Sequence, residues 1–194
     1  MEYILSRIDL YLILQIGDTN TLCWYVDVAF GVHHDMNSHT GMVMTMDLGD
    51  AISNSTKQKF NTKRSTEADL VGIDDEISLI IWYEYFLAEK VYRVRDNLCY
   101  QDNRSTAKLE NNGRASSSES TRHINVRYFF VAYRINSGEM KIEYFPTLDI
   151  IGDYFTNPLQ VSLFRKSRNL ILGIEEADVA KYNTKAHEWI KESK

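Results

Sequence analysis

The sequence is poor in several residues and patterns that mark particular protein classes. Two cysteines among 194 residues are too few for a disulfide framework, and both lie in apolar runs, which is typical of reduced, buried thiols inside a cell. The longest apolar stretch near the start covers residues 10–14, far short of the roughly 20 residues that cross a bilayer. No basic segment followed by a cleavage site opens the chain, so no secretory signal is expected. We therefore predict an intracellular protein that does not enter a membrane.

Proline is scarce, and positive charge is in deficit. Two prolines and no Pro/Gly/Ser-rich linker predict a single domain. The net charge of -5 differs from that of proteins that grip a nucleic-acid backbone, which are usually basic. The cations are nevertheless clustered: residues 104–134 carry six basic against two acidic side chains, and four more cations stand together at Lys57, Lys59, Lys63 and Arg64. A nucleic-acid groove and a solvated helix face explain these clusters equally well.

The spacing of apolar residues predicts an α/β fold. Alternation predicts a strand over residues 21–30, and two more strands over 41–46 and 51–55 follow at distances that favour an antiparallel meander. From Ser65 onward, apolar residues recur at helical spacing as far as Leu87. The later elements are expected in the order strand 97–101, helix 104–110, helix 127–137, strand 140–145 and helix 149–156. This alternation predicts a mixed sheet with helices on both faces.

Four carboxylates occupy conspicuous positions in these elements. Asp27 interrupts the apolar first strand, Asp102 ends a later strand, and Glu67 and Asp153 lie in the first turns of helices. A charge inside an apolar strand is unfavourable unless it binds something, and ligands of α/β sheets gather at the carboxyl ends of strands. Carboxylate oxygens are the ligands of hard divalent cations, and two such ions about 3.5–4 Å apart suit phosphodiester hydrolysis. For any one of these acids alone, a helix cap or a salt bridge is the better interpretation.

Seven short motifs occur in a recognisable order. They are Tyr25–Phe30, Ser38–Gly41, Ser55–Lys59, Ser65–Leu70, Tyr100–Ser105, Arg122–Tyr128 and Gly152–Leu159. Each motif is weak alone, but together they closely resemble the ribonuclease H region of copia-type retrotransposon polyproteins, over about residues 10–170.

The resemblance implies an α/β, ribonuclease H-like fold: a five-stranded mixed sheet, its first three strands antiparallel, with helices on both faces. It also implies three parts, namely residues 1–20 as a connector remnant from the polymerase side, 21–172 as the ribonuclease H-like domain, and 173–194 as a polar C-terminal helix or tail. No Tyr-x-Asp-Asp box is present. The chain is therefore expected to be a fragment that lacks the polymerase part and does not polymerise on its own.

The activity that the resemblance implies is endonucleolytic hydrolysis of the RNA strand of an RNA–DNA hybrid. Two Mg²⁺ ions, or Mn²⁺, would be held by Asp27, Glu67, Asp102 and Asp153; one activates the water and the other stabilises the leaving 3′ oxygen. The hybrid is expected to contact Asn103, Ser105, His123, Lys57, Lys59, Lys63 and Arg64. The partners would be the hybrid and a fused reverse transcriptase, in the cytoplasm, a virus-like particle or the nucleus.

Two departures from the family pattern support a second hypothesis. Asp69 stands where the family usually has a second Glu, and Asn157 stands where it usually has Lys. Such changes are typical of a drifting copy. The alternative is therefore a decayed or domesticated module that is catalytically idle and at most binds nucleic acid or a protein partner.

Other interpretations of the acids and histidines are weaker. An integrase would use Asp102 and Glu139, which are 37 residues apart, but Glu139 leads a predicted strand instead of lying on a helix. No zinc pattern fits the loop residues His33, His34, Asp35 and His39. The aromatic run over residues 82–86 lies in the long helix, where we expect it to pack in the core.

Overall fold

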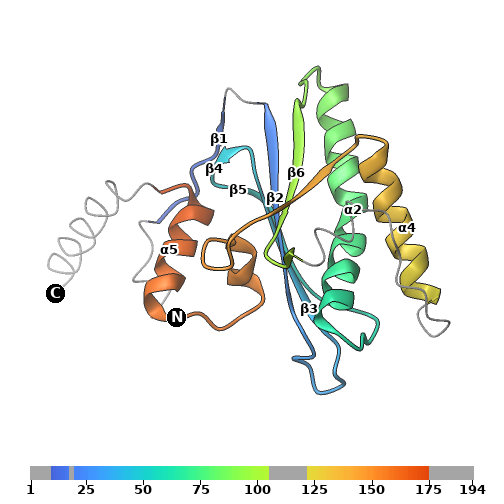
Figure 1. Cartoon of the computed structure of the whole chain (residues 1–194). Coiled ribbons are helices and arrows are strands. Elements are labelled where there is room, and N and C mark those ends of the chain that lie inside the picture. Colours follow the sequence, from blue (N-terminus) through green and yellow to red (C-terminus); the bar gives the residue numbers. More distant parts are fainter. Residues whose placement is uncertain (1–9, 18–19, 105–121, 175–194) are drawn as a thin grey trace, which may run out of the picture.

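A five-stranded mixed sheet forms the centre of the computed structural model, which describes residues 10–17, 20–104 and 122–174 (Figure 1). Its strands are β2 (Thr21–Ala29), β3 (His39–Thr45), β5 (Asp50–Lys57), β6 (Asp96–Gln101) and β7 (Lys141–Tyr144). They lie in the order β5-β3-β2-β6-β7; β2 pairs antiparallel with β3 and β3 with β5, whereas β6 is parallel to β2 and β7 to β6. This arrangement confirms the predicted ribonuclease H-like fold class.

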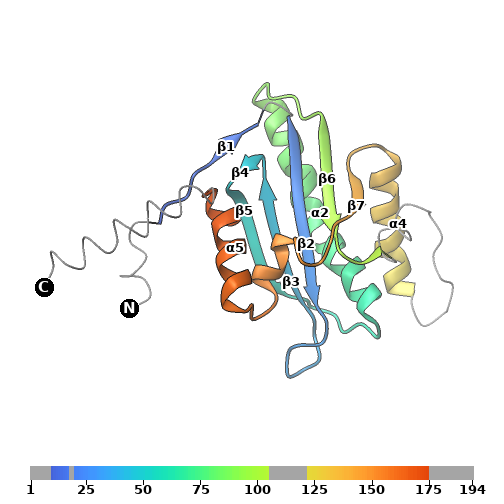
Figure 2. The same ribbon diagram turned by 60° about the vertical axis from the view of Figure 1, so that its left-hand side comes forward.

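Helices cover both faces of this sheet, as predicted (Figures 1 and 2). The long helix α2 (Ser65–Glu89) lies against one face, and α4 (Arg122–Asn136) lies on its outer side. The short helix η2 (Ile151–Phe155) and α5 (Val161–Leu172) lie on the opposite face. Short connections between β2, β3 and β5 place the antiparallel strands first, and the long crossover through α2 then permits a parallel β6.

Two features of the fold differ from the sequence prediction. The helix expected over residues 149–156 is a 3-10 helix of five residues, because Pro158 lacks an N–H and disfavours the α conformation at the residue before it. A second, two-stranded sheet joins β1 (Gln15–Ile16) to β4 (Asp47–Leu48) and was not expected. Of the helix expected over 104–110, the structure describes only Arg104.

The main core lies between α2 and the sheet. Its fully buried members include Leu22, Trp24, Val26, Met42, Met44, Ile73, Ile77 and Ile80. Each isoleucine contributes roughly 1.5–3 kcal/mol through burial. The Trp24 indole N–H donates to Asn97 Oδ1 at 2.8 Å, which satisfies the polar atom of this buried ring.

The aromatic run of α2 corrects one expectation. Trp82 and Tyr85 are 55% and 54% exposed and Phe86 is 39% exposed, whereas Tyr83 packs edge-on against Trp24. Consecutive residues of a helix point in different directions, so a run of four aromatic side chains cannot all face one core. The two cysteines are free; Cys99 is buried and Cys23 is partly buried.

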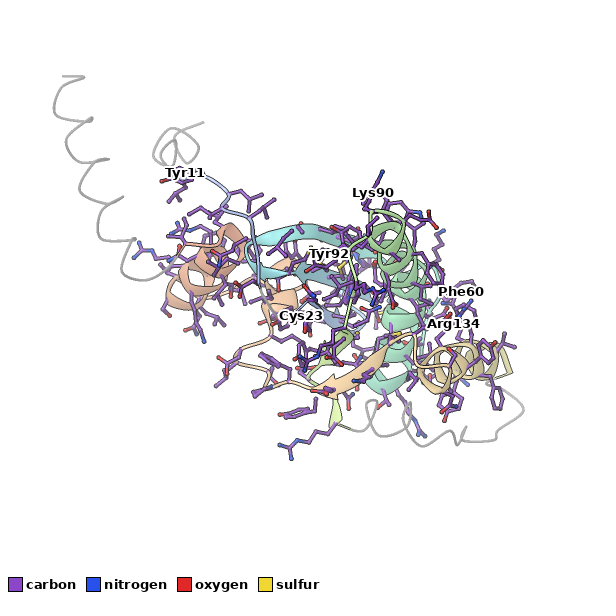
Figure 3. The ribbon with its side chains drawn as sticks, turned by 90° about the horizontal axis from the view of Figure 1, so that it is seen from above. Tyr11, Cys23, Phe60, Lys90, Tyr92 and Arg134 are labelled. Carbon is purple, nitrogen blue, oxygen red and sulfur yellow. The ribbon has the colours of Figure 1, made fainter. Side chains whose placement is uncertain are left out.

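Residues 10–17, which precede β2, are hydrogen-bonded to the end of α5 and to the residue before β4. Ile13 N donates to Leu172 O, and Gly17 N donates to Met46 O, each at 2.9 Å. Figure 3 shows Tyr11 on the side of α5, away from Phe60 and Arg134 on the side of α2 and α4. The division at residues 20 and 172 stays a prediction, and residues 175–194 lie outside the described part. No helix of the described residues is long and apolar enough to cross a membrane.

Candidate functional site: a carboxylate cluster at the edge of the central strands

Asp27 is the most buried acid of the candidate site. It lies near the carboxyl end of β2 with a side chain in contact with little solvent, since the residue is 7% exposed. The pKa of Asp27 is raised from its ordinary 3.8 to about 6: burial is the largest cause, a hydrogen bond from Thr156 opposes it, and the negative charges of Asp102 and Asp153 contribute to the rise. Asp102 and Asp153 therefore lie within electrostatic range of Asp27, and we call these three acids the carboxylate cluster.

The parallel pairing of β2 with β6 places Asp102 beside Asp27. In this register Tyr25 of β2 is paired with Tyr100 of β6. Asp27 and Asp102 each stand two residues further along their chain segments. Asp102 follows the last residue of β6, so it stands at the carboxyl end of that strand, where ligands of such sheets bind. The parallel pairing of these two strands is therefore enough to bring Asp102 beside Asp27.

Asp153 reaches the cluster because η2 lies directly on the sheet backbone. A Cβ atom added to Gly152 would stand 3.0 Å from Tyr25 O and 3.1 Å from Asp27 N, which is tighter than ordinary contacts. A Cβ added to Gly41 of β3 would stand 2.7 Å from Gly152 O. The absence of two side chains thus lets η2 approach β2 and β3 closely enough to hold Asp153 near Asp27.

The first turn of α2 presents two acids, and they have different surroundings. The Glu67 side chain is half-buried, and its Oε2 accepts a hydrogen bond from the backbone N–H of Lys63 at 2.9 Å. Asp69 is buried, and its Oδ2 accepts a hydrogen bond from Asn103 Nδ2 at 2.6 Å. Because Asn103 directly follows Asp102, this contact ties Asp69 to the strand end that carries the cluster.

The sequence prediction of metal ligands includes Glu67 and treats Asp69 only as a departure from the family pattern, although a signal for Asp69 is present. Asp69 stands four residues before Ile73 and eight before Ile77, so it continues the buried stripe of α2 toward the start of the helix. An acid on the buried stripe of a helix faces the sheet. Glu67 lies outside that stripe, and the position of an acid in the first turn favours the cap contact that it makes.

The carboxylate cluster has no cationic partner among the described residues. None of the salt bridges among the described residues involves Asp27, Asp102 or Asp153. Asp27 and Asp153 instead accept hydrogen bonds from the neutral side chains of Thr156 and Asn157. In the described part of the chain, no three acid, histidine or cysteine side chains stand close enough to ligate one ion together. A divalent ion would therefore have to draw these carboxylates closer.

The predicted nucleic-acid contacts are partly exposed and partly engaged elsewhere. Lys59, Lys63 and Arg64 lie exposed on the segment between β5 and α2, whereas Lys57 forms a salt bridge with Asp35. Asn103 donates to Asp69, so its amide is engaged inside the protein. The predicted contacts Ser105 and His123 lie outside the residues whose side chains the structure describes.

Glu139 is not a partner of Asp102. The backbone carbonyl of Glu139 accepts a hydrogen bond from Asn97, at the opposite end of β6, and its carboxylate pairs with Arg134. Five residue steps at about 3.3 Å each put that end of β6 roughly 16 Å from the end that carries Asp102. This separation excludes the integrase pairing of these two acids.

The loop histidines bond to each other and not to a cluster of acids. His33 Nε2 and His39 Nδ1 are 3.0 Å apart, and His39 Nε2 lies 2.8 Å from Ser55 Oγ. No group of three potential metal ligands occurs among the described residues.

The sequence relatives of this chain include two retrovirus-related polyproteins from plant transposons. The chain is 27% identical over 135 residues, 69% of its length, to the retrovirus-related Pol polyprotein from transposon TNT 1-94 of Nicotiana tabacum. It is 28% identical over 154 residues, 78% of its length, to the corresponding polyprotein from transposon RE1 of Arabidopsis thaliana. The resemblance to a retrotransposon Pol polyprotein is thereby confirmed. The chain spans about a tenth of the length of these two polyproteins.

Solved structures and family models add little beyond this. No family model matches the chain. A compost metagenome RNase H1 matches 66% of this chain and 86% of its own, with a TM-score of 0.48 and 11% identity. The N-terminal RNase H domain of a Mycobacterium tuberculosis protein matches 76% of this chain and 98% of its own, with a TM-score of 0.41 and 12% identity.

Proposed function

We propose that the chain is a metal-dependent endonuclease that hydrolyses the RNA strand of RNA–DNA hybrids, as a module of a retrotransposon polyprotein. The observation that carries the proposal is the carboxylate cluster: three acids gathered around a buried strand position, with no cation of the described chain paired to any of them. An arrangement that concentrates negative charge without a countercharge is unfavourable for folding alone and suits a divalent cation.

Asp27, Asp102 and Asp153 would hold two Mg²⁺ or Mn²⁺ ions by their carboxylate oxygens. When bound, the ions supply an activated water and a countercharge for the leaving 3′ oxygen. The carboxylates bind and orient, and the buried position of Asp27 keeps the site in a low-dielectric setting where its charge acts strongly. The exposed Lys59, Lys63 and Arg64 would contact phosphates of the hybrid.

We assign the fourth acid to Asp69 in preference to Glu67. Asp69 is buried on the face of α2 that meets the sheet, and it is hydrogen-bonded to Asn103, the residue directly after Asp102. The Glu67 carboxylate is already engaged by the backbone N–H of Lys63. Both acids lie in the same helical turn, so they form a matched pair for testing.

The decisive experiment is a cleavage assay on a hybrid with labelled RNA, in Mg²⁺ and in Mn²⁺. We expect wild type to release products with 5′-phosphate ends, and Asp102→Asn and Asp69→Asn to lower the rate by orders of magnitude. Glu67→Gln should stay within a few-fold of wild type. Equal rates for wild type and Asp102→Asn would identify a contaminant and refute the proposal; loss in Glu67→Gln with retention in Asp69→Asn would restore Glu67 as the ligand.

A catalytically idle module is the alternative from a different class. It would lack metal-dependent cleavage and also lack a rise in melting temperature with Mg²⁺ or Mn²⁺. A ligand that binds only the native state at about 100 times its dissociation constant adds about 2.7 kcal/mol to the free energy of unfolding. A wild-type melting temperature that does not respond to either ion would favour the idle module.

A further inference from the structure

The turn that follows η2 contacts two members of the carboxylate cluster at once. The Thr156 hydroxyl donates to Asp27 Oδ2, and Asn157 Nδ2 donates to Asp153 Oδ1. Asn157 Nδ2 also lies 3.2 Å from Thr156 Oγ1, which it donates to. Two neighbouring residues therefore fix one oxygen of each carboxylate and are themselves joined, so that Asp27 on β2 and Asp153 on η2 are held through a single turn.

The turn is fixed to the sheet by contacts that do not involve the carboxylates. Ser55 Oγ of β5 donates to the backbone carbonyl of Phe155 at 3.0 Å. A Cβ atom added to Gly41 would stand 2.8 Å from Thr156 Cγ2 and 2.9 Å from Phe155 Cβ, so this part of β3 lies directly under the turn. The position of Thr156 is thus set by β3 and β5, on the side of β2 that is opposite to β6.

Resting on the proposed function, we propose that Thr156 is a positioning residue that aims the Asp27 carboxylate at the metal shared with Asp153. A carboxylate has about four lone-pair directions on two oxygens, and a donor fixed on one oxygen limits rotation of the group and leaves the other oxygen for a cation. Asn157 does the same for Asp153. Because both donors are neutral, they orient the two acids without cancelling the charge that attracts the ion.

The test compares Mn²⁺ binding in full-length variants by isothermal titration calorimetry, with melting temperature in chelator as a measure of folding. Thr156→Val keeps the shape of the side chain and removes the hydroxyl; we expect the dissociation constant for Mn²⁺ to rise at least tenfold. Thr156→Ser keeps the hydroxyl and should stay within about threefold of wild type. A merely structural role would lower the melting temperature of Thr156→Val without this rescue of metal affinity by serine.

Ser55→Ala provides a gentler variant, and Ser137→Ala is its matched control. Both serines are exposed and donate to a backbone carbonyl, that of Phe155 and that of Arg134 respectively, but only Ser55 holds the turn. We expect Ser55→Ala to weaken Mn²⁺ binding at least threefold and Ser137→Ala to leave it unchanged. If Thr156→Val does not fold, this pair decides the question.

The outcomes separate the positioning role from the proposed function. The positioning role would be overturned if wild type binds Mn²⁺ and either Thr156→Val or Ser55→Ala binds it equally well. That result would leave the nuclease proposal standing. Wild type without saturable Mn²⁺ binding would overturn both. Weakened binding in Thr156→Val and Ser55→Ala, with normal binding in Thr156→Ser and Ser137→Ala, would establish the role.

Discussion

Replacing Asp27 with asparagine should stabilise the metal-free protein, and the gain should grow with pH. The pKa of Asp27 is about 6 in the folded chain and 3.8 in its ordinary state, a difference of about two pKa units that burial causes first of all. A raised pKa means that the folded protein binds the proton more tightly than the unfolded chain does. The ionised acid therefore lowers the free energy of unfolding at every pH above about 4, and the loss is complete above pH 6.

The size of this effect follows from the two pKa values. At about 1.4 kcal/mol per pKa unit, the ionised Asp27 costs about 3 kcal/mol at pH 8 but only about 0.6 kcal/mol at pH 4. Asparagine resembles the protonated acid, and its Oδ1 can still accept the hydroxyl of Thr156. The difference in stability between the variant and wild type should therefore increase by roughly 2 kcal/mol between pH 4 and pH 8.

Urea unfolding of both proteins in chelator, at several pH values from 4 to 8, measures this difference. The other titrating groups act in both proteins and cancel in the comparison. A second series with saturating Mn²⁺ should narrow the difference at pH 8, because wild type gains about 2.7 kcal/mol at 100 times its dissociation constant and the variant gains less. Stability curves that run parallel from pH 4 to pH 8 would refute the burial argument for Asp27.

Two further predictions concern the surface and the core. The double variant Lys59→Glu, Lys63→Glu should bind a hybrid with a weaker dependence on salt. The slope of log binding constant against log salt, measured by fluorescence anisotropy, should fall in magnitude by roughly one per lost phosphate contact. Lys57→Glu should change the slope less, because that ammonium already pairs with Asp35; an equal effect would contradict this. Asn97→Ala should lower the free energy of unfolding by about 1–3 kcal/mol, because it leaves a buried indole N–H without its acceptor. A loss below about 0.5 kcal/mol in urea unfolding would show that water replaces the amide.

The parts of the fold that the sequence predicted are those with a strong period. β2 alternates apolar and polar residues, and α2 repeats buried residues at Ile73, Ile77 and Ile80, so both elements and their order were predictable. The neighbouring positions of Asp27 and Asp102 follow from the parallel pairing of β2 with β6, which the period of either strand alone does not specify. Periodicity fixes which face of an element is buried, and topology then fixes which side chains share an edge.

Other features depend on contacts that no local pattern contains. The close approach of η2 to β3 depends on Gly41, which is more than 100 residues away in the sequence. The choice between Glu67 and Asp69 depended on the phase of α2, which the stripe of isoleucines indicated once it was extended to the first turn. The exposure of Trp82 depends on which face of α2 it occupies, and a run of aromatic residues along a helix does not share one face.

The carboxylate cluster gathers three acids, none of which forms a salt bridge with a described cation. Several acids elsewhere in the described part do have a cation beside them: Asp35, Asp74, Asp75, Asp96, Asp149 and Glu139 form salt bridges. Two acids of the cluster, Asp27 and Asp153, receive hydrogen bonds from neutral groups, namely the hydroxyl of Thr156 and the amide of Asn157. A neutral donor orients a carboxylate and lowers the cost of burying it without removing its charge. The cluster thus combines fixed geometry with uncompensated charge, and that combination favours a divalent cation over a role in folding.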